Sequence, residues 1–295
     1  MSQAASTSPK PLFDHVVIVG VGLIGGSIAK ALKAKGVAGQ VTGLGRNRER
    51  LLDAQRAGLL DDVATSASEL KPFDLAVVCT PVDRIVADVR ALQAVAPPTA
   101  LITDVGSVKG RICRELSPQA PGVATFIGSH PLAGSEQGGW EHADENLFQG
   151  KVCAVTPCGQ RESAVFAISL FWTLMGMRST RVNPERHDHI VALTSHLPHA
   201  AAAAIASLMT EEARSLGATG FRDTTRVASG DPALWTAILI ENRDAVADQL
   251  KTLVGQLGKF QQALEQGDAR AVEALLTQGK KARDQWLKSL EIYSR

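Results

Sequence analysis

The feature that most constrains the fold of this 295-residue chain is a glycine-rich turn close to its N-terminus. Residues 16–19 are a continuous run of β-branched apolar residues, which is typical of a strand covered on both faces of a parallel sheet. The sequence Gly20-Val-Gly-Leu-Ile-Gly25 follows directly, and a helix is expected from about Ser27 to Lys35. A G-x-G-x-x-G turn between a strand and a helix is the fingerprint of dinucleotide-binding βαβ units. The pattern therefore predicts an α/β fold built on a doubly wound, Rossmann-type sheet.

Each glycine of this fingerprint has its own physical reason. Gly20 permits the tight turn, Gly22 lets the backbone approach a pyrophosphate, and Gly25 lets the helix pack closely on the strand. Amide donors and the positive end of the helix dipole complete an anion site. We therefore expect the cofactor to bind at Gly20, Gly22, Leu23, Ile24 and Gly25. The alternative is a glycine-rich turn without a ligand.

The strand expected from Gln40 to Leu44 bears on the choice of cofactor. An NAD-binding unit usually carries an acidic residue about 20 positions after the fingerprint, where it binds the ribose hydroxyls. No acid stands at this strand end, which is followed by Arg46 and Asn47. Since arginine can bind a 2′-phosphate through charge-assisted hydrogen bonds, the sequence favours NADP over NAD. The alternative is that Arg46 is a solvated loop residue and that the site accepts either cofactor.

Polar residues also follow the next strands expected along the chain. One apolar run ends at Thr80, and a later run ends at Asp104 and Ser107. In a doubly wound sheet the carboxyl ends of neighbouring strands lie side by side along one crevice, where ligands bind. We therefore expect Thr80 to contact the cofactor and Ser107 to lie near the reacting groups. A helix cap is the alternative role for Ser107.

His130 is the candidate base. It follows a short apolar run, 124–127, within the segment 128–136, whose proline and two glycines predict a rigid turn that aims its side chains. A neutral imidazole, with an ordinary pKa of about 6.5, is a suitable general base near neutral pH. A lone histidine more often only ties a loop to the backbone. The alignment of polar residues at the strand ends favours the catalytic interpretation.

The character of the chain changes after residue 182. Two more strands are expected before that point, and Asn183-Pro184 then predicts a helix start with no further strand beyond it. We expect a loose tail at 1–11, a dinucleotide-binding domain at 12–182 and an all-α domain at 183–295. A long helix opened by Asp231-Pro232 carries apolar residues at three- and four-residue steps from Val246 to Leu264. Such a stripe more often packs into the core of its own chain, but in a domain with so few elements the helices of a second subunit can complete it, so a homodimer is expected.

Composition excludes several classes of partner. The net charge of +1 and the 4% aromatic content give no basis for binding nucleic acid or an anionic membrane surface. The longest apolar run, Ala200 to Met209, is too short to span a membrane. No C-x-x-C or H-E-x-x-H pattern is present, so no metal site is expected. Cysteines within apolar runs indicate a reducing compartment, so we expect a cytoplasmic protein. With nucleic acid and membranes excluded, a small-molecule substrate is expected.

The helical half carries polar clusters of its own. His196 and His199 lie three residues apart, and His187 and His189 lie upstream, so a zinc site has to be weighed against a substrate pocket. Arg226 follows two threonines in a loop. An arginine placed in this way could bind a substrate carboxylate, whereas the alternative is a surface ion pair with Asp223.

Seven motifs occur in order along the chain, and together they are specific where each alone is weak. They are G-V-G-L-I-G-G-S at 20–27, C-T-P at 79–81, D-V-G-S-V-K at 104–109, G-S-H-P-L-A-G-S-E at 128–136, S-H-L-P-H at 195–199, F-R-D-T-T-R at 221–226 and D-P-A-L-W at 231–235. On these motifs the chain resembles the prephenate/arogenate dehydrogenase family of tyrosine biosynthesis over nearly its whole length.

The resemblance implies oxidative decarboxylation of a cyclohexadienyl acid to a phenol, with NAD or NADP as hydride acceptor and with no metal. It implies that His130 accepts the proton of the ring hydroxyl, that Ser107 hydrogen-bonds near that hydroxyl and the nicotinamide, and that Arg226 anchors a carboxylate. It also implies a pocket lined by Ser135, Glu136, His196 and His199. The spacer Val-Ala-Ser-Gly at 227–230 departs from the family pattern and leaves the conformation of that loop open.

Two rival hypotheses share parts of this sequence pattern. A β-hydroxyacid or imine-reductase type dehydrogenase also joins a Rossmann domain to a helical one, but it is expected to place lysine or aspartate on the interdomain helix, where this chain has histidines. A non-catalytic NADP sensor would leave His130, Ser107 and Arg226 without a shared role. No residue of the sequence decides between prephenate and arogenate as substrate.

Overall fold

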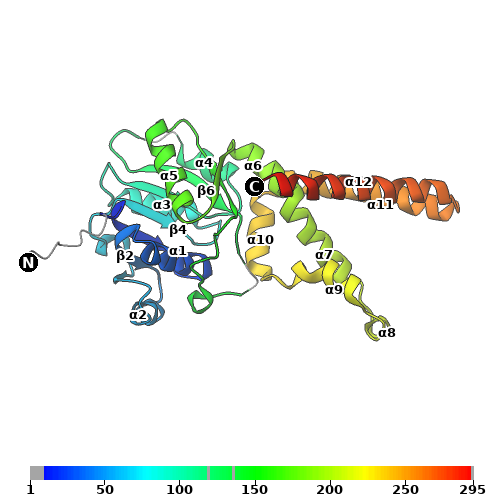
Figure 1. Cartoon of the computed structure of the whole chain (residues 1–295), viewed down its shortest axis with the longest axis horizontal. Coiled ribbons are helices and arrows are strands. Elements are labelled where there is room, and N and C mark those ends of the chain that lie inside the picture. Colours follow the sequence, from blue (N-terminus) through cyan, green and yellow to red (C-terminus); the bar gives the residue numbers. More distant parts are fainter. Residues whose placement is uncertain (1–9, 118–119, 135–136, 294–295) are drawn as a thin grey trace, which may run out of the picture.

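The computed structural model describes residues 10–117, 120–134 and 137–293, so most of the expected tail at 1–11 and both Ser135 and Glu136 lie outside the described residues. The chain forms a sheet domain covered by helices, followed by a helical part from which a long pair of helices projects (Figure 1). The predicted order, an N-terminal α/β domain and a C-terminal all-α domain, is confirmed.

The sheet is eight-stranded, with the order β3-β2-β1-β4-β5-β6-β7-β8. The first six strands in this spatial order, β3, β2, β1, β4, β5 and β6, are parallel to one another. Strand β7 pairs antiparallel with β6, and β8 pairs parallel with β7. This order places the carboxyl ends of β1, β4, β5 and β6 next to one another. The strands are β1 (Phe13–Val19), β2 (Ala38–Leu44), β3 (Asp62–Ala64), β4 (Leu75–Val78), β5 (Leu101–Asp104), β6 (Thr125–Pro131), β7 (Val152–Thr156) and β8 (Arg178–Arg181).

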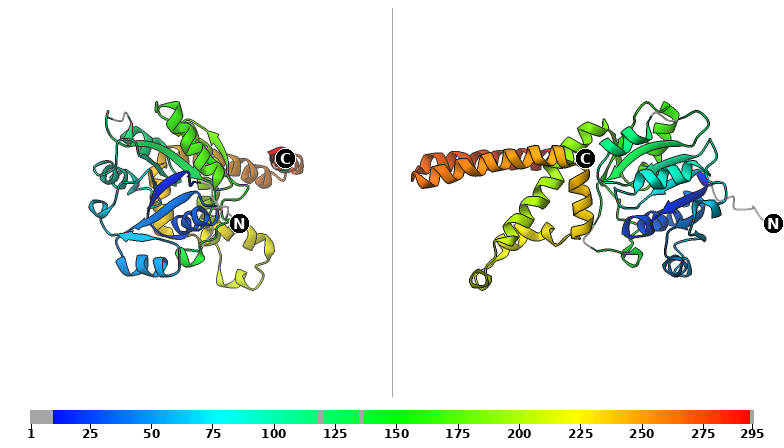
Figure 2. Two further views of the ribbon diagram at one scale, coloured as in Figure 1. Left: turned by 60° about the vertical axis from the view of Figure 1, so that its left-hand side comes forward. Right: turned by 180° about the vertical axis from the view of Figure 1, so that it is seen from behind.

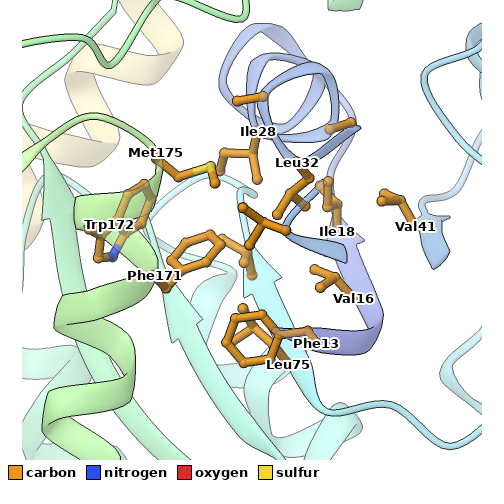
Figure 3. Packing of buried hydrophobic residues seen from close by; sticks show 14 of the residues in the cluster. Phe13, Val16, Ile18, Ile28, Leu32, Val41, Leu75, Phe171, Trp172 and Met175 are labelled. Atoms are coloured by element: carbon orange, nitrogen blue, oxygen red, sulfur yellow. The ribbon is translucent and has the colours of Figure 1, made fainter. Parts of the chain in front are cut away.

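Helices cover both faces of the sheet, and each face has its own apolar cluster. Strands β1 and β4 supply side chains to both clusters, which explains why their sequences are apolar without alternation. Figure 3 shows one cluster, in which Ile28 and Leu32 of one helix and Phe171 and Trp172 of another pack over Val16 and Ile18. The helices of the domain are α1 (Leu23–Ala34), α2 (Arg48–Arg56), α3 (Ile85–Gln93), α4 (Gly110–Leu116) and α5 (Glu162–Leu174), with short 3₁₀ turns η1 (Ala67–Glu69) and η2 (Trp140–His142).

The boundaries of several elements differ from the prediction. Helix α1 begins at Leu23 and not near Ser27, because the fingerprint itself makes the first turn with Gly22 as its cap. Strand β6 continues to Pro131, so His130 lies in a strand and not in a turn. The extension has a physical cause: beyond the parallel pairing with β5, which ends at Ile127, β6 gains a second partner in the antiparallel β7.

The helical part begins with α6 (Pro184–Val191), which continues through the π-helical turn η3 (Ala192–His196) into α7 (Leu197–Ser207). Asn183 caps α6 by accepting from the backbone N–H of Arg186, and Pro184 occupies the first turn, as the sequence predicted. Shorter elements follow before the last three helices: α8 (Glu211–Arg214), α9 (Thr219–Thr225), η4 (Arg226–Ser229), α10 (Pro232–Glu241), α11 (Arg243–Glu265) and α12 (Ala269–Tyr293).

The long helix expected from Asp231 onward is broken at Asn242, whose backbone (φ −110°, ψ 24°) ends α10 and precedes α11. Helices α11 and α12 form a hairpin that extends away from the sheet domain in both views of Figure 2. Of the predicted stripe on α11, Leu250, Leu257 and Leu264 are exposed in the single chain, whereas Val246 is buried. The exposed large apolar residues of the hairpin are Leu250, Val254, Leu257, Leu264, Leu276, Trp286, Leu287 and Leu290. An apolar surface of this length marks an interaction site.

By length and composition alone, one helix among the described residues could span a membrane, the continuous helix Pro184–Ser207 of 24 residues. The apolar run Ala200 to Met209 begins within α7, which is continuous with α6 through η3, so the helix is longer than the run alone predicts. Core helices of soluble proteins pass the same test. This helix also carries the buried polar residues His187, Asp188 and His196.

Candidate active site

The geometry of the fingerprint matches what each glycine is expected to do. Gly20 has φ +89°, and a Cβ there would lie 3.1 Å from the carbonyl of Cys79, the residue that follows β4. A Cβ on Gly25 would lie 2.3 Å from the carbonyl oxygen of Gly20 and 3.0 Å from the side chain of Ile18, so only glycine allows the first turn of α1 to pack this closely on the end of β1. No atom lies within 4 Å of a Cβ built on Gly22 among the described residues, which leaves room for a pyrophosphate above the backbone.

A cavity of about 900 Å³ opens next to this turn. Its volume lies in the range of ligand and cofactor sites. It extends from the fingerprint across the end of β2 to the first turn of α2 and to the end of β4. The predicted cofactor residues that line it are Gly20, Gly22, Arg46, Asn47 and Thr80, whereas Leu23, Ile24 and Gly25 lie in the adjoining first turn of α1 and do not line it.

The far end of the cavity is basic. The side chain of Asn47 accepts from the backbone N–H of Arg50 at 3.1 Å and so caps α2. Arg50 itself pairs with Glu141 at 3.0 Å, and Arg48 lies 4.0 Å from Glu69. Within the described part of the chain Arg46 is exposed and forms no hydrogen bond or ion pair. Its guanidinium is therefore available to a ligand at the N-terminus of α2.

Thr80 lines the same cavity from the end of β4, but its hydroxyl is already engaged. Its Oγ1 donates to the carboxylate of Asp88 at 2.6 Å. The hydroxyl can still accept a hydrogen bond from a ligand, since its lone pairs are not consumed by this donation. The predicted contact of Thr80 with the cofactor stays a prediction.

The loop after β5 is held by a fully buried ion pair between Asp104 and Lys109, which are both 0% exposed. One carboxylate oxygen of Asp104 also accepts from the backbone N–H of Gly106 at 2.9 Å, and the other accepts from the N–H of Ser129 at 3.0 Å. These bonds fix the loop that carries the partly buried Ser107 and tie it to β6. Ser107 does not cap α4: Lys109 occupies its N-cap position, and the side chain that accepts from the first backbone N–H groups of the helix belongs to a distant residue.

That residue is Asp188 of α6, which crosses from the helical part to the N-terminus of α4. Its two carboxylate oxygens accept from the backbone N–H groups of Lys109 at 2.8 Å and of Gly110 at 2.7 Å. A carboxylate at a helix N-terminus is favoured by the dipole and by the unpaired amide donors. Asp188 is therefore one of the side chains that join the active-site face of the sheet domain to the helical part.

The same carboxylate leads to His130 through a chain of hydrogen bonds. Nδ1 of His187 lies 2.8 Å from Oδ1 of Asp188, and Nε2 of His187 lies 2.9 Å from Nδ1 of His130. The sequence pattern did not reveal this relay, since His187 was weighed only as a metal ligand and Asp188 was not singled out. His189, which the sequence offered together with His187 as a candidate metal ligand, is exposed.

The relay fixes the tautomer of His130. A carboxylate only accepts, so the Nδ1 atom of His187 carries a hydrogen, and Nε2 of the neutral ring is an acceptor. Nδ1–H of His130 must then donate to it, which leaves Nε2 of His130 unprotonated. Burial, followed by the charges of His187, Lys109 and His196, holds the pKa of His130 well below its ordinary value. The lowered pKa favours the neutral imidazole with its hydrogen on Nδ1, and the role of His130 as a base stays a prediction.

His196 and His199 are both buried, and their predicted place in a substrate pocket stays a prediction. His196 ends the π-helical turn, whose extra residue rotates the following helix face by about 100° relative to a regular helix. His199 stacks on the indole of Trp235, with ring centroids 3.5 Å apart and planes at 15°. Burial lowers the pKa of His199. Both rings thus contact Trp235 in the helical part.

Arg226 begins η4, which packs against α7. The alternative of an ion pair with Asp223 is wrong, because Asp223 pairs with Arg222 at 3.1 Å. In the described ranges Arg226 is exposed and has no ionic partner of its own. Its predicted neighbours Ser135 and Glu136 lie outside the described residues.

Two family models match the chain in succession. Residues 28–181 match the nucleotide-binding domain of prephenate dehydrogenase, and residues 183–278 match its dimerization domain. The chain belongs to the prephenate dehydrogenase family. The resemblance inferred from the seven sequence motifs is thereby confirmed.

Members of this family are similar to the chain over most of its length. It is 32% identical to a prephenate dehydrogenase of Bacillus subtilis, over 92% of this chain and 76% of that one. A solved prephenate dehydrogenase from Aquifex aeolicus, in complex with hydroxyphenyl propionate and NAD+, is 29% identical with a TM-score of 0.85, covering 92% of this chain and 98% of the other. Synechocystis arogenate dehydrogenase is 28% identical with a TM-score of 0.78, covering 92% and 99%.

Proposed function

We propose that this chain catalyses the oxidative decarboxylation of prephenate to 4-hydroxyphenylpyruvate with a nicotinamide cofactor. The observation that carries the proposal is the relay from Asp188 through His187, which leaves Nε2 of His130 as an unprotonated base in a chain of this family. His130 lies near the end of β6, the neighbour of β5, at the sheet edge where dinucleotide folds hold their ligands. The open space above Gly22 and the cavity beside it fit a dinucleotide.

The residues support a reaction in which positioning and one base suffice. A bound oxidised nicotinamide supplies the hydride acceptor. Nε2 of His130 takes the proton of the ring hydroxyl as the hydride leaves the carbon that carries it, and the ring becomes a dienone. Asp188 balances the charge that then develops on His130 through His187. Cleavage of the bond to the ring carboxylate releases CO₂, and its electron pair makes the ring aromatic while the carbonyl oxygen regains a proton.

We further propose that NADP is the preferred cofactor. Support comes from the absence of an acidic residue at the end of β2 and from the exposed, unpaired guanidinium of Arg46 at the edge of the cavity, as far as the described residues extend. The N-terminus of α2 adds amide donors on the same side. A site that accepts both cofactors is the alternative.

Replacing Arg46 with alanine is expected to weaken NADP+ binding by about ten- to a hundredfold and NAD+ binding far less, because only NADP+ carries the 2′-phosphate. Dissociation constants for both dinucleotides, measured by calorimetry, test this. Arg56→Ala removes an arginine of the same helix region outside the cavity and serves as the control. Equal losses for the two cofactors would contradict the assignment.

Replacing Arg226 with alanine is expected to raise KM by about ten- to a hundredfold while kcat changes little, because a carboxylate contact present in the bound substrate is lost. Steady-state kinetics at saturating cofactor measure both constants. Arg222→Ala is the matched control, since Arg222 is exposed and paired with Asp223. A fall in kcat at unchanged KM would show that Arg226 does not anchor the substrate.

Arogenate is the second candidate substrate, because the chain is similar to Synechocystis arogenate dehydrogenase. A matrix of two substrates and two cofactors, followed by the appearance of reduced nicotinamide, tests the proposal as a whole. Absence of turnover with both substrates would refute the proposed reaction.

We also propose a homodimer through the exposed apolar residues of α11 and α12, a domain boundary at residues 182–183, and a cytoplasmic location.

A further inference from the structure

The break between α10 and α11 places a buried amide among the histidines. Asn242 is 6% exposed, and its own backbone stays paired, since its N–H donates to the carbonyl of Ile238 and its carbonyl accepts from the N–H of Val246. The break therefore does not arise from an unsatisfied backbone. It frees the side chain of Asn242 to point toward α6 and the π-helical turn, where both of its hydrogen-bond contacts lie.

The two contacts of this side chain settle its orientation. Nδ2 of Asn242 lies 2.9 Å from the backbone carbonyl oxygen of Asp188 and 3.0 Å from Nδ1 of His196. A carbonyl oxygen only accepts, so the atom facing it must be the amide nitrogen. The second hydrogen of the same nitrogen then points at Nδ1 of His196, which must be the unprotonated nitrogen of that ring.

It follows that the hydrogen of the neutral His196 ring is on Nε2. That atom is buried and has no hydrogen-bond partner among the described residues. A buried N–H without an acceptor is costly, and such groups in native structures usually meet a ligand or water. His196 is edge-on to Trp235, with ring centroids 6.2 Å apart, so the indole restricts the ring from one side.

We propose that Asn242 is a positioning residue that holds His196 as a hydrogen-bond donor for an acceptor oxygen of the substrate. The site then contains two histidines in opposite roles. The relay from Asp188 makes Nε2 of His130 an acceptor, and Asn242 makes Nε2 of His196 a donor. The identity of the acceptor, a carboxylate or keto oxygen of the side chain, rests on the proposed function, whereas the tautomer of His196 does not.

The electrostatics agree with this assignment. The pKa of His196 is lowered to about 4, chiefly by burial, so the ring stays neutral across the physiological range. The titratable groups that act on the ring are Asp188, which opposes the shift, and His187, His199 and His130. An imidazolium would also place Nδ1–H against the amide hydrogen of Asn242, which is a second reason for neutrality.

The first test reads the tautomer directly. In the whole protein labelled with ¹⁵N-histidine, the imidazole nitrogen shifts of His196, assigned through the His196→Gln variant, are expected to show a protonated Nε2 and a bare Nδ1 from pH 6 to 9. A proton on Nδ1 in the unaltered protein would overturn the proposal. This measurement needs no substrate, so it stands even if prephenate is not turned over.

The second test exchanges the donor for an acceptor. In Asn242→Asp a carboxylate faces Nδ1 of His196, so Nδ1 gains a hydrogen and the pKa of the ring rises. Below the raised pKa the imidazolium still donates from Nε2; above it the neutral ring keeps its hydrogen on Nδ1, and Nε2 becomes an acceptor. KM is therefore expected to rise with pH, about tenfold per unit, to a total of about ten- to a hundredfold.

Asn183→Asp is the matched control, because Asn183 caps α6 and an aspartate caps equally well. In that variant and in the unaltered protein KM is expected to lack the pH dependence, and the tautomer of His196 is expected to be unchanged. Circular dichroism and cofactor binding check that each variant is folded. A KM of Asn242→Asp that follows the profile of the unaltered protein, in a folded variant, would reduce Asn242 to a purely structural residue.

Discussion

Replacing His130 with asparagine is expected to lower kcat by about a hundred- to ten-thousandfold, the range that general-base assistance contributes. Asparagine can still donate to Nε2 of His187 from its amide, so the relay and the fold are retained, but it cannot accept the substrate proton. His130 does not line the dinucleotide cavity, so the dissociation constant for NADP+ is expected to stay unchanged. Initial rates and a cofactor titration measure the two effects separately.

The pH profile of the unaltered enzyme gives an independent check on His130. A base works only when it is unprotonated, and the pKa of His130 is held well below its ordinary value. The acid limb of kcat/KM is therefore expected below about pH 6.5, the ordinary value for histidine. His189→Asn, at an exposed position of α6, is the control and should turn over normally. Near-normal turnover in His130→Asn would remove His130 from the mechanism.

Replacing Asp188 with asparagine is expected to lower kcat by about a hundredfold or more and to lower the free energy of unfolding by about 2–4 kcal/mol. The carboxylate accepts three hydrogen bonds, from Nδ1 of His187 and from the backbone N–H groups of Lys109 and Gly110. The asparagine amide has only one oxygen, so its NH₂ group must face at least one of these three N–H donors. His187 can then exchange its tautomer, which removes the acceptor that orients His130.

Steady-state kinetics and urea-induced unfolding of the same preparations test both parts of this expectation. Glu185→Gln neutralises another carboxylate of α6, which pairs with Arg114 at 3.3 Å on the surface, and is expected to change neither quantity much. If Asp188→Asn lost stability but kept its turnover, the carboxylate would be a helix cap and not part of the relay.

Local signals carried the prediction of the sheet domain. The fingerprint joins a strand, a turn and a helix within about twenty residues, and the apolar runs of β1 and β4 reflect burial on both faces. Polar residues at strand ends identified Thr80, Ser107 and His130 because the topology of doubly wound sheets places such ends together. The extension of β6 past Ile127 was missed, because it depends on a partner strand, β7, that lies more than twenty residues later.

The relay and the amide contact had no local signal. Asp188 bonds to backbone groups 79 and 78 residues away, and Asn242 bonds to His196 from 46 residues away. Asn242 lies within an apolar periodic pattern, so the pattern predicted a continuous helix. One cue was present: two histidines flank Asp188 in a segment otherwise suited to a surface helix. That spacing indicated a polar site but not which ring nitrogen faces which partner.

The crossing of Asp188 from α6 onto the first turn of α4 has a consequence for the order of events during folding. The sheet domain can form its glycine turn and its cavity from its own residues, but His130 acquires a defined tautomer only when the helical part has docked. A half-assembled molecule would therefore hold a dinucleotide and yet lack an oriented base. Catalytic activity would therefore appear only after the contact of Asp188 with α4 has formed, and this contact also completes the fold. No separate inhibitory segment would be needed to keep incompletely folded molecules inactive.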